Sequence, residues 1–91
     1  MMVDTILGRV TKVIDGDTFD MNITGVGANN SETYNATERI RLADMNAPEL
    51  RTTTGQKAKQ NLKAKIGDKI VKCKVQSRDS YGRLICKVSL A

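Results

Sequence analysis

The sequence lacks several residue types, and each absence excludes a kind of site or protein. It has no histidine and two cysteines in 91 residues, which excludes a Cys/His zinc site. No window approaches the ~20 apolar residues of a membrane-spanning helix. Aromatic residues are limited to Phe19, Tyr34 and Tyr81. That is few for a surface that binds nucleic acid by stacking bases.

Positive charge is in excess. Fifteen Lys and Arg stand against ten Asp and Glu, for a formal charge of +5. Much of the excess lies in residues 51–74, which include Lys57, Lys59 and Lys63, with Asp68 as the only acid. Such a face attracts polyanions, and the expected partner is DNA and/or RNA. A lysine-rich helix that is simply solvated is the ordinary alternative.

The length indicates one small domain, residues 1–91. Residues 1–5 lack the basic and apolar regions of a secretory signal, and no membrane segment is present. We therefore expect an intracellular protein with no membrane partner.

Hydrophobic periodicity predicts five strands and one helix. Polar and apolar residues alternate over residues 6–14, 18–24, 38–45, 69–77 and 84–90. Ala58, Leu62 and Ile66 form one apolar stripe of a helix, which Thr53 or Thr54 can cap and which Gly67 can end. This count and order predict a five-stranded, partly open Greek-key barrel of the oligonucleotide/oligosaccharide-binding (OB) type, with the helix between strands three and four.

The two cysteines lie in the last two predicted strands. Cys73 and Cys86 each share a strand face with apolar residues. A hairpin about residues 79–80 brings them near each other on the core side. We expect buried free thiols, with a cross-strand disulfide as the alternative.

Residues 41–49 combine a strand end with polar groups. Pro48 cannot donate to a sheet and biases Ala47 away from helix, so the strand must stop there. The turn then carries Asn46, the carbonyl of Ala47 and the carboxylate of Glu49. It is a plausible place for a hard cation or a phosphate, although a strand that exits at a proline is common.

Further charges lie elsewhere in the chain. Asp15 and Asp17 flank Gly16 in a predicted hairpin turn, where Gly16 supplies a backbone conformation that other residues resist. Arg41 and Arg83 are planar donors suited to phosphate oxygens.

These groups make up the parts of phosphodiester hydrolysis when taken together. Asp17 and the oxygens at Asn46 and Ala47 are hard ligands that suit Ca²⁺, and Glu49 can take a proton from water. Cationic groups on a phosphoryl centre, a metal ion and a general base complete the set. Each group alone has an ordinary explanation, because Asp-Gly-Asp turns and surface arginines are frequent.

Three motifs in this order resemble the staphylococcal-nuclease-like (thermonuclease) family. They are Val-Ile-Asp-Gly-Asp-Thr at 13–18, Arg-Leu at 41–42 with Ala-Pro-Glu at 47–49, and Asp-Ser-Tyr-Gly-Arg at 79–83. The resemblance covers nearly the whole chain. It implies an OB barrel with helices, and Ca²⁺-dependent cleavage of DNA and RNA.

The resemblance implies a metal site. Asp17 matches the first aspartate that binds the metal, and Asp15 is an acid of the same turn that supports it. Asn46 stands where the family has its second metal-binding aspartate. Ala47 matches the residue that offers its backbone carbonyl.

The resemblance also implies catalytic roles. Glu49 matches the proposed general base. Arg41 and Arg83 match the two arginines that bind the phosphate and stabilise the transition state. Tyr81 lies where a tyrosine lines the nucleotide pocket.

Two departures from the family pattern affect these expectations. Asn46 keeps an oxygen but removes one negative charge, so metal binding should be weak; Asp44 lies two residues back and could face the same way. The chain also stops at Ala91, as a short form without the family's C-terminal helices. A partner or a second copy could replace the missing surface, and an exposed edge of the last strand would favour a homodimer.

The leading hypothesis is a metal-dependent nuclease. The first rival is a non-catalytic OB module that binds nucleic acid and is weakened at the metal site by Asn46. A third possibility is an assembly domain with neither activity.

Overall fold

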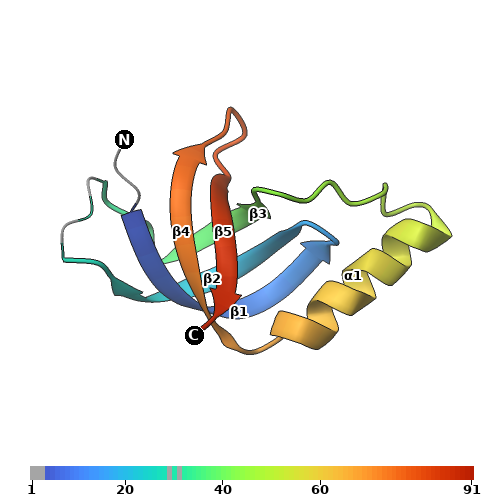
Figure 1. The fold of residues 1–91 in the computed structure, drawn as a ribbon, viewed down its shortest axis with the longest axis horizontal. Coiled ribbons are helices and arrows are strands. Elements are labelled where there is room, and N and C mark those ends of the chain that lie inside the picture. Colours follow the sequence, from blue (N-terminus) through green and yellow to red (C-terminus); the bar gives the residue numbers. More distant parts are fainter. Residues whose placement is uncertain (1–3, 29, 31) are drawn as a thin grey trace.

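The chain folds as a small barrel with a helix at its side (Figure 1). The computed structural model describes residues 4–28, 30 and 32–91. The elements are β1 (Asp4–Asp15), β2 (Thr18–Val26), β3 (Thr37–Leu42), α1 (Thr53–Ile66), β4 (Ile70–Arg78) and β5 (Leu84–Leu90). The predicted five-stranded OB architecture with one helix between the third and fourth strands is confirmed.

Strand pairing closes the barrel in the order β1-β2-β3-β5-β4. All pairs are antiparallel except β3 with β5, which run parallel from Ile40–Leu84 to Leu42–Cys86. The expectation of a partly open barrel is therefore wrong. β5 pairs with β3 only as far as Cys86. The edge of β5 that could pair with a second copy is therefore limited to residues 87–90.

The core consists of side chains that alternate inward along the strands. Phe19, Met21, Ile40 and Leu84 are fully buried in one apolar cluster. This cluster confirms the predicted inward face of the second strand, because Ile23 packs against the same core.

The third strand ends earlier than predicted. β3 stops at Leu42 rather than near residue 45, although the Ala43 N–H still donates to the carbonyl of Cys86 at 2.8 Å. Alternation identifies the buried face, whereas the end of the parallel pairing with β5 fixes where the strand stops.

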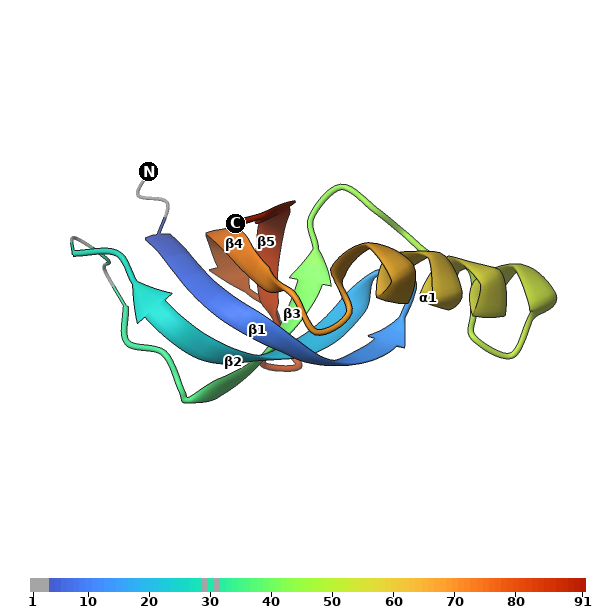
Figure 2. The ribbon, with the colours of Figure 1, turned by 90° about the horizontal axis from the view of Figure 1, so that it is seen from below.

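The helix α1 lies beside the β1–β2 turn at one end of the barrel (Figure 2). Its N-cap is Thr52, whose Oγ1 accepts from the Gly55 N–H at 3.0 Å, so the prediction of Thr53 or Thr54 is wrong by one or two residues. Gly67 is the C-cap as predicted. A methyl group on Gly67 would lie 2.5 Å from the Lys63 carbonyl oxygen. The residue with the left-handed backbone conformation is Asp68, which follows Gly67.

Two further expectations can be compared with the structure. Cys73 and Cys86 are buried free thiols, and the disulfide alternative is wrong. Burial and a hydrogen bond with Cys73 raise the pKa of the Cys86 thiol, the hydrogen bond being the larger cause. No helix in the described residues is long and apolar enough to cross a membrane.

Candidate active site

The β1–β2 turn holds the two acids of the first motif. The backbone N–H of Asp17 donates to Oδ1 of Asp15 at 3.0 Å, and Oδ1 of Asp17 accepts from the Thr18 hydroxyl at 2.9 Å. Asp17 is 9% exposed. The Asp17 carbonyl accepts from the Leu42 N–H at 2.8 Å, which ties this turn to the end of β3.

The connecting segment, residues 43–52, runs from β3 to α1 and docks on this turn. The Ala47 N–H donates to Oδ2 of Asp17 at 3.0 Å. A methyl group on Gly16 would lie 2.6 Å from the Ala58 Cβ and 2.7 Å from the Ala47 Cβ. Gly16 is therefore required by close approach. The expectation that Gly16 adopts a backbone conformation that other residues resist is wrong, because among the glycines of the described residues only Gly82 has a positive φ.

Arg41 joins the turn to the connecting segment. Its Nη2 contacts Oδ1 of Asn46 and lies 3.6 Å from Oδ2 of Asp17. Its Nη1 donates to the Leu42 carbonyl at 3.3 Å. The structure thus brings four residues of the predicted site to one point: Asp17, Arg41, Asn46 and Ala47.

The two acids of the turn differ in their affinity for a proton. Burial and a hydrogen bond to Asp17 raise the pKa of Asp15 above its ordinary value. Burial acts on Asp17 in the same direction, but its hydrogen bonds with Asp15 and Ala47 outweigh burial and lower its pKa. As the pH falls, Asp15 therefore takes up a proton before Asp17 does.

The ligand types at this point fit a hard cation, although only one of them, Asp17, carries a negative charge. Asp17 and Asn46 supply side-chain oxygens, and the Ala47 backbone supplies a carbonyl, which are ligand types that Ca²⁺ accepts. No group of three or more His, Cys, Asp or Glu able to hold a metal occurs in the described residues. The Arg41 guanidinium instead contacts the Asn46 and Asp17 oxygens. The residues fit a cation that is weakly held.

Glu49 lies farther out on the connecting segment. Its side chain is 69% exposed, and Oε2 accepts from Nε of Arg51 at 2.5 Å. Its carbonyl accepts from the Thr52 N–H at 3.0 Å and from the Thr52 hydroxyl at 2.7 Å. The backbone of Glu49 is fixed by the start of α1. Its carboxylate makes no contact with Asp17 or Arg41 in the described residues.

The arginine turn, residues 79–83, carries Arg83 and Tyr81. Oδ1 of Asp79 accepts from the backbone N–H groups of Tyr81 and Arg83, at 3.0 and 2.9 Å. Oδ2 of Asp79 accepts from Nε of Arg83 at 2.8 Å. The Arg83 guanidinium lies 5.4 Å from the centre of the Tyr81 ring, and Tyr81 is 85% exposed. The turn thus presents a cation and an aromatic ring together.

The parallel pairing of β3 with β5 places this turn near the other arginine. Ile40 pairs with Leu84 and both are buried, so the flanking Arg41 and Arg83 lie on the outer face of the barrel. Arg39 shares that face and lines a small cleft with Tyr81 and Arg83. Arg39 itself is paired with Asp20 at 2.8 Å.

Comparison with known families agrees with this arrangement. Residues 39–91 match the model of a family described as staphylococcal nuclease homologue. The chain belongs to this family. The matched region contains Arg41, Glu49 and Arg83.

Curated relatives give the same family by overall similarity. A micrococcal nuclease of Shigella flexneri is 33% identical over 78 residues, which are 86% of this chain and 39% of that protein. An endonuclease, Htp3, of Saprolegnia parasitica is 32% identical over 95 residues, covering 92% of this chain and 45% of that protein. The protein ParB of Escherichia coli is 32% identical over 78 residues. The chain spans between 38% and 46% of the length of the curated relatives that it matches.

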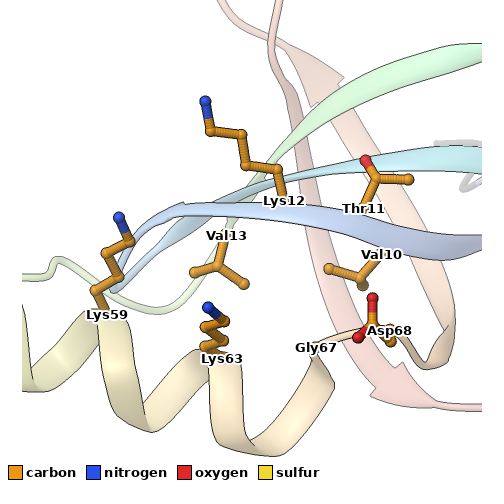
Figure 3. Close-up of a pocket in the computed structure, with 8 residues that line it drawn as sticks. All are labelled: Val10, Thr11, Lys12, Val13, Lys59, Lys63, Gly67 and Asp68. Carbon is orange, nitrogen blue, oxygen red and sulfur yellow. The ribbon is translucent and has the colours of Figure 1, made fainter.

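The predicted nucleic-acid-binding lysines divide into two groups in this nuclease-family barrel. Lys59 and Lys63 extend from α1 toward β1, and Val10 and Val13 point back from β1 toward the helix (Figure 3). Lys12 extends from the other side of the same strand (Figure 3). All five line a cleft of about 260 Å³. Lys57 is exposed and does not line this cleft.

Sequence reasoning missed several residues that hold the nuclease-family site in place. Thr18 binds Asp17, and a signal for it existed, because Thr18 closes the Asp-Gly-Asp-Thr motif. Arg51 pairs with Glu49 two residues away. Glu38 and Arg78 lie 40 positions apart in the sequence and meet in space, and no local pattern pointed to them.

Proposed function

We propose that this chain hydrolyses phosphodiester bonds in nucleic acids with the help of a divalent cation, Ca²⁺. The observation that carries the proposal is the meeting of Asp17, Arg41, Asn46 and Ala47 at one point of a nuclease-family barrel. A barrel needs none of these contacts to close, because the strands of the core already pair without them.

The proposed reaction is the attack of water on phosphorus. The water oxygen forms a bond to phosphorus, the bond to the leaving ester oxygen breaks, and the water proton passes to the Glu49 carboxylate. Nε of Arg51 donates to Oε2 of Glu49, and Oε1 accepts no hydrogen bond in the described residues. That oxygen is therefore available to accept the proton.

Arg41 and Arg83 would bind the phosphate oxygens. Both arginine side chains are partly exposed, at 22% and 28%, and each is already paired with a carboxylate, Asp17 or Asp79. Oriented cations stabilise the charge that develops on the phosphoryl group. Asp17, Asn46 and the Ala47 carbonyl would hold Ca²⁺, which when bound neutralises charge on the phosphate.

The direct test of this proposal is Glu49→Gln. The substitution keeps the shape and removes the base, so we expect cleavage to fall by about 10²–10⁴-fold while oligonucleotide binding persists. Glu32→Gln is the matched control, because Glu32 is exposed and makes the same change of charge outside the site. Equal cleavage by the wild type and Glu49→Gln would contradict the proposal.

A second candidate function is a non-catalytic module that binds nucleic acid. The observation that favours it is the contact of Arg41 with Asn46, since an amide replaces one metal-binding charge and a guanidinium occupies its oxygen. In that case, oligonucleotide affinity depends on the lysines and Glu49→Gln changes nothing.

The lysine contribution is measured by the salt dependence of binding. We propose that Lys59 and Lys63 contact phosphates beside the β1–α1 cleft. The double variant Lys59→Gln/Lys63→Gln should lower the slope of log K against log salt by about 0.7 for each lost contact with a single strand. Lys65→Gln/Lys72→Gln is the control with the same net charge, because neither lysine lines the cleft. Equal slopes for the two variants would contradict a contact at the cleft.

Pairing with a second copy of this chain stays a prediction. It would use residues 87–90 of β5, where pairing with β3 has ended. Sedimentation over a range of protein concentrations tests it, and a mass that stays monomeric contradicts it.

A further inference from the structure

The arginine turn is held in two ways, and the first is local. Its shape comes from the Asp79 carboxylate and from two backbone bonds, Asp79 N–H to the Arg83 carbonyl at 2.8 Å and Gly82 N–H to the Asp79 carbonyl at 3.0 Å. Gly82 has φ of 85°, a conformation that glycine adopts without strain. These bonds join the turn only to itself.

The second way links the turn to a buried group on β3. Nη1 of Arg78 donates to the Gly82 carbonyl at 2.8 Å. The same guanidinium donates to Oε1 of Glu38 at 3.1 Å and to Oε2 at 3.2 Å. The Glu38 side chain is 3% exposed, and its Oε2 also accepts from the Asn35 N–H at 2.9 Å. A buried carboxylate on β3 thus reaches the turn through one arginine.

We propose that Glu38 and Arg78 are positioning residues that fix the arginine turn, and with it Arg83, relative to β3 and Arg41. This inference rests on the proposed function, because it assigns Arg83 to the phosphate. The pair meets neither the phosphate nor the cation, and it acts through the Gly82 carbonyl.

Packing does not provide this link. A methyl group at Gly82 would meet nothing within 4 Å, so side chains do not press on the turn there. Tyr81 is largely exposed and contacts Arg83 of the same turn. Among the side-chain hydrogen bonds of the described residues, the bond from Arg78 to Gly82 is therefore the one that ties the tip of the turn to a buried group.

The buried pair is also strongly ionic. Burial acts to raise the pKa of Glu38, but hydrogen bonds from Arg78 and Asn35 outweigh burial and lower it. The Arg78 side chain is 33% exposed, and its guanidinium bonds both this carboxylate and the Gly82 carbonyl of the turn. A planar guanidinium offers its donors to both acceptors in a fixed fork, whereas an ammonium group is a compact charge without that fixed geometry.

The double variant Glu38→Leu/Arg78→Met separates positioning from stability. It removes one charge of each sign, so the formal charge stays +5. Replacement of a buried ion pair by apolar residues is often neutral or stabilising, so the melting temperature should hold or rise. Amide hydrogen exchange at Tyr81 and Arg83 should accelerate, and kcat/KM for oligonucleotide cleavage should fall by about 10- to 100-fold, because Arg83 is misplaced.

A folded double variant with unchanged exchange in the turn and unchanged kcat/KM would overturn the inference. If the wild type cleaves nothing, the proposed function fails, and amide exchange alone still decides whether the pair fixes the turn. If the double variant does not fold, Arg78→Lys takes its place. That variant keeps a positive charge near Glu38 without the planar fork, and we expect faster exchange at Arg83 than in the wild type. An unchanged rate contradicts the inference.

Discussion

Two irregular segments carry the candidate site, and they are built differently. The arginine turn has an acceptor inside it, because Asp79 binds Tyr81 and Arg83, and a buried ion pair behind it. In the connecting segment, Glu49 accepts from the Arg51 side chain, but no described side chain of the segment accepts from a backbone N–H of the same segment. The Ala47 N–H donates to Asp17, and the Thr52 hydroxyl at the start of α1 donates to the Glu49 carbonyl.

This difference shows which parts of the chemistry the fold prepares in advance. Arg83, the proposed phosphate ligand, is held by its own turn, and Asp17 is held by the barrel. The proposed base, Glu49, is placed by a segment that takes its position from its neighbours, and its side chain remains exposed. The candidate site therefore combines arginines that neighbouring carboxylates orient with a carboxylate, Glu49, whose placement depends on how the connecting segment packs.

Among the substitutions that compare the two segments, we expect the largest effect at the arginine turn. Arg83→Lys keeps the charge but loses the planar donor that Asp79 orients. We expect cleavage to fall by about 10²–10³-fold, with little change in the melting temperature. Single-turnover kinetics on a labelled oligonucleotide measures this fall, and Lys87→Arg on β5, which exchanges the same two residue types outside the site, is the control. Activity within about twofold of the wild type would show that Arg83 does not contact the phosphate.

The next effect concerns the contact between the connecting segment and the first turn of α1. A methyl group on Gly55 would lie 1.9 Å from the Glu49 carbonyl oxygen, so Gly55→Ala must displace either Glu49 or the first turn of α1. We expect a loss of about 1–3 kcal/mol in unfolding free energy and up to about 10²-fold in cleavage. Urea denaturation and cleavage assays measure both.

Ala64→Gly is the control for Gly55→Ala. It makes the reverse change at an exposed helix position, where about 1 kcal/mol is expected from propensity alone, with cleavage unaffected. If Gly55→Ala were as stable and active as the wild type, the packing of Glu49 against α1 would be refuted.

A smaller effect concerns the cap of the helix. Thr52→Ala removes the acceptor of the Gly55 N–H and a donor to the Glu49 carbonyl. We expect a loss of about 1 kcal/mol in unfolding free energy. Thr52→Ser keeps both bonds and should restore most of the loss. Equal stability of the Ala and Ser variants would argue against this cap.

The smallest effect is the dependence of stability on acid. The pKa of Asp17 is lowered from its ordinary 3.8 and that of Glu38 from its ordinary 4.5, so both favour the folded state above these values. This stability is lost as pH falls through the folded pKa values. The raised pKa of Asp15 acts in the opposite direction. We expect a shallow decline in melting temperature below about pH 5.

A substitution at Glu38 measures its share of this decline in acid. Glu38→Gln should melt lower than the wild type at neutral pH and show a weaker decline in acid. A decline as steep as that of the wild type would mean that Glu38 contributes nothing to it.

The sequence alone predicted the elements better than their ends. The last strand was placed at residues 84–90, as observed, because its alternation is clean and a turn motif precedes it. The helix was found from its stripe of Ala58, Leu62 and Ile66. Its cap was missed because Thr52, Thr53 and Thr54 are chemically alike, and only the packing of Gly55 against Glu49 selects Thr52.

The candidate site was less accessible from the sequence. The resemblance named Asp17, Asn46 and Ala47, and their proximity could not be derived from spacing, since Ala47 lies 30 positions from Asp17. The link from Glu38 to Arg78 had no local signal, because a bond between distant strands depends on register. Pairing of Arg51 with Glu49 was likewise visible only in three dimensions.

The most direct test of a site centred on Asp17, Asn46 and Ala47 is cleavage of single-stranded DNA, with Ca²⁺ and with a chelator. The wild type and Asn46→Asp are compared. We expect the wild type to cleave with Ca²⁺ and to stop with the chelator, and Asn46→Asp to reach the same rate at lower Ca²⁺ because a negative charge is restored. Cleavage by neither protein, or cleavage that the chelator leaves unchanged, would contradict a metal-dependent nuclease built on these residues.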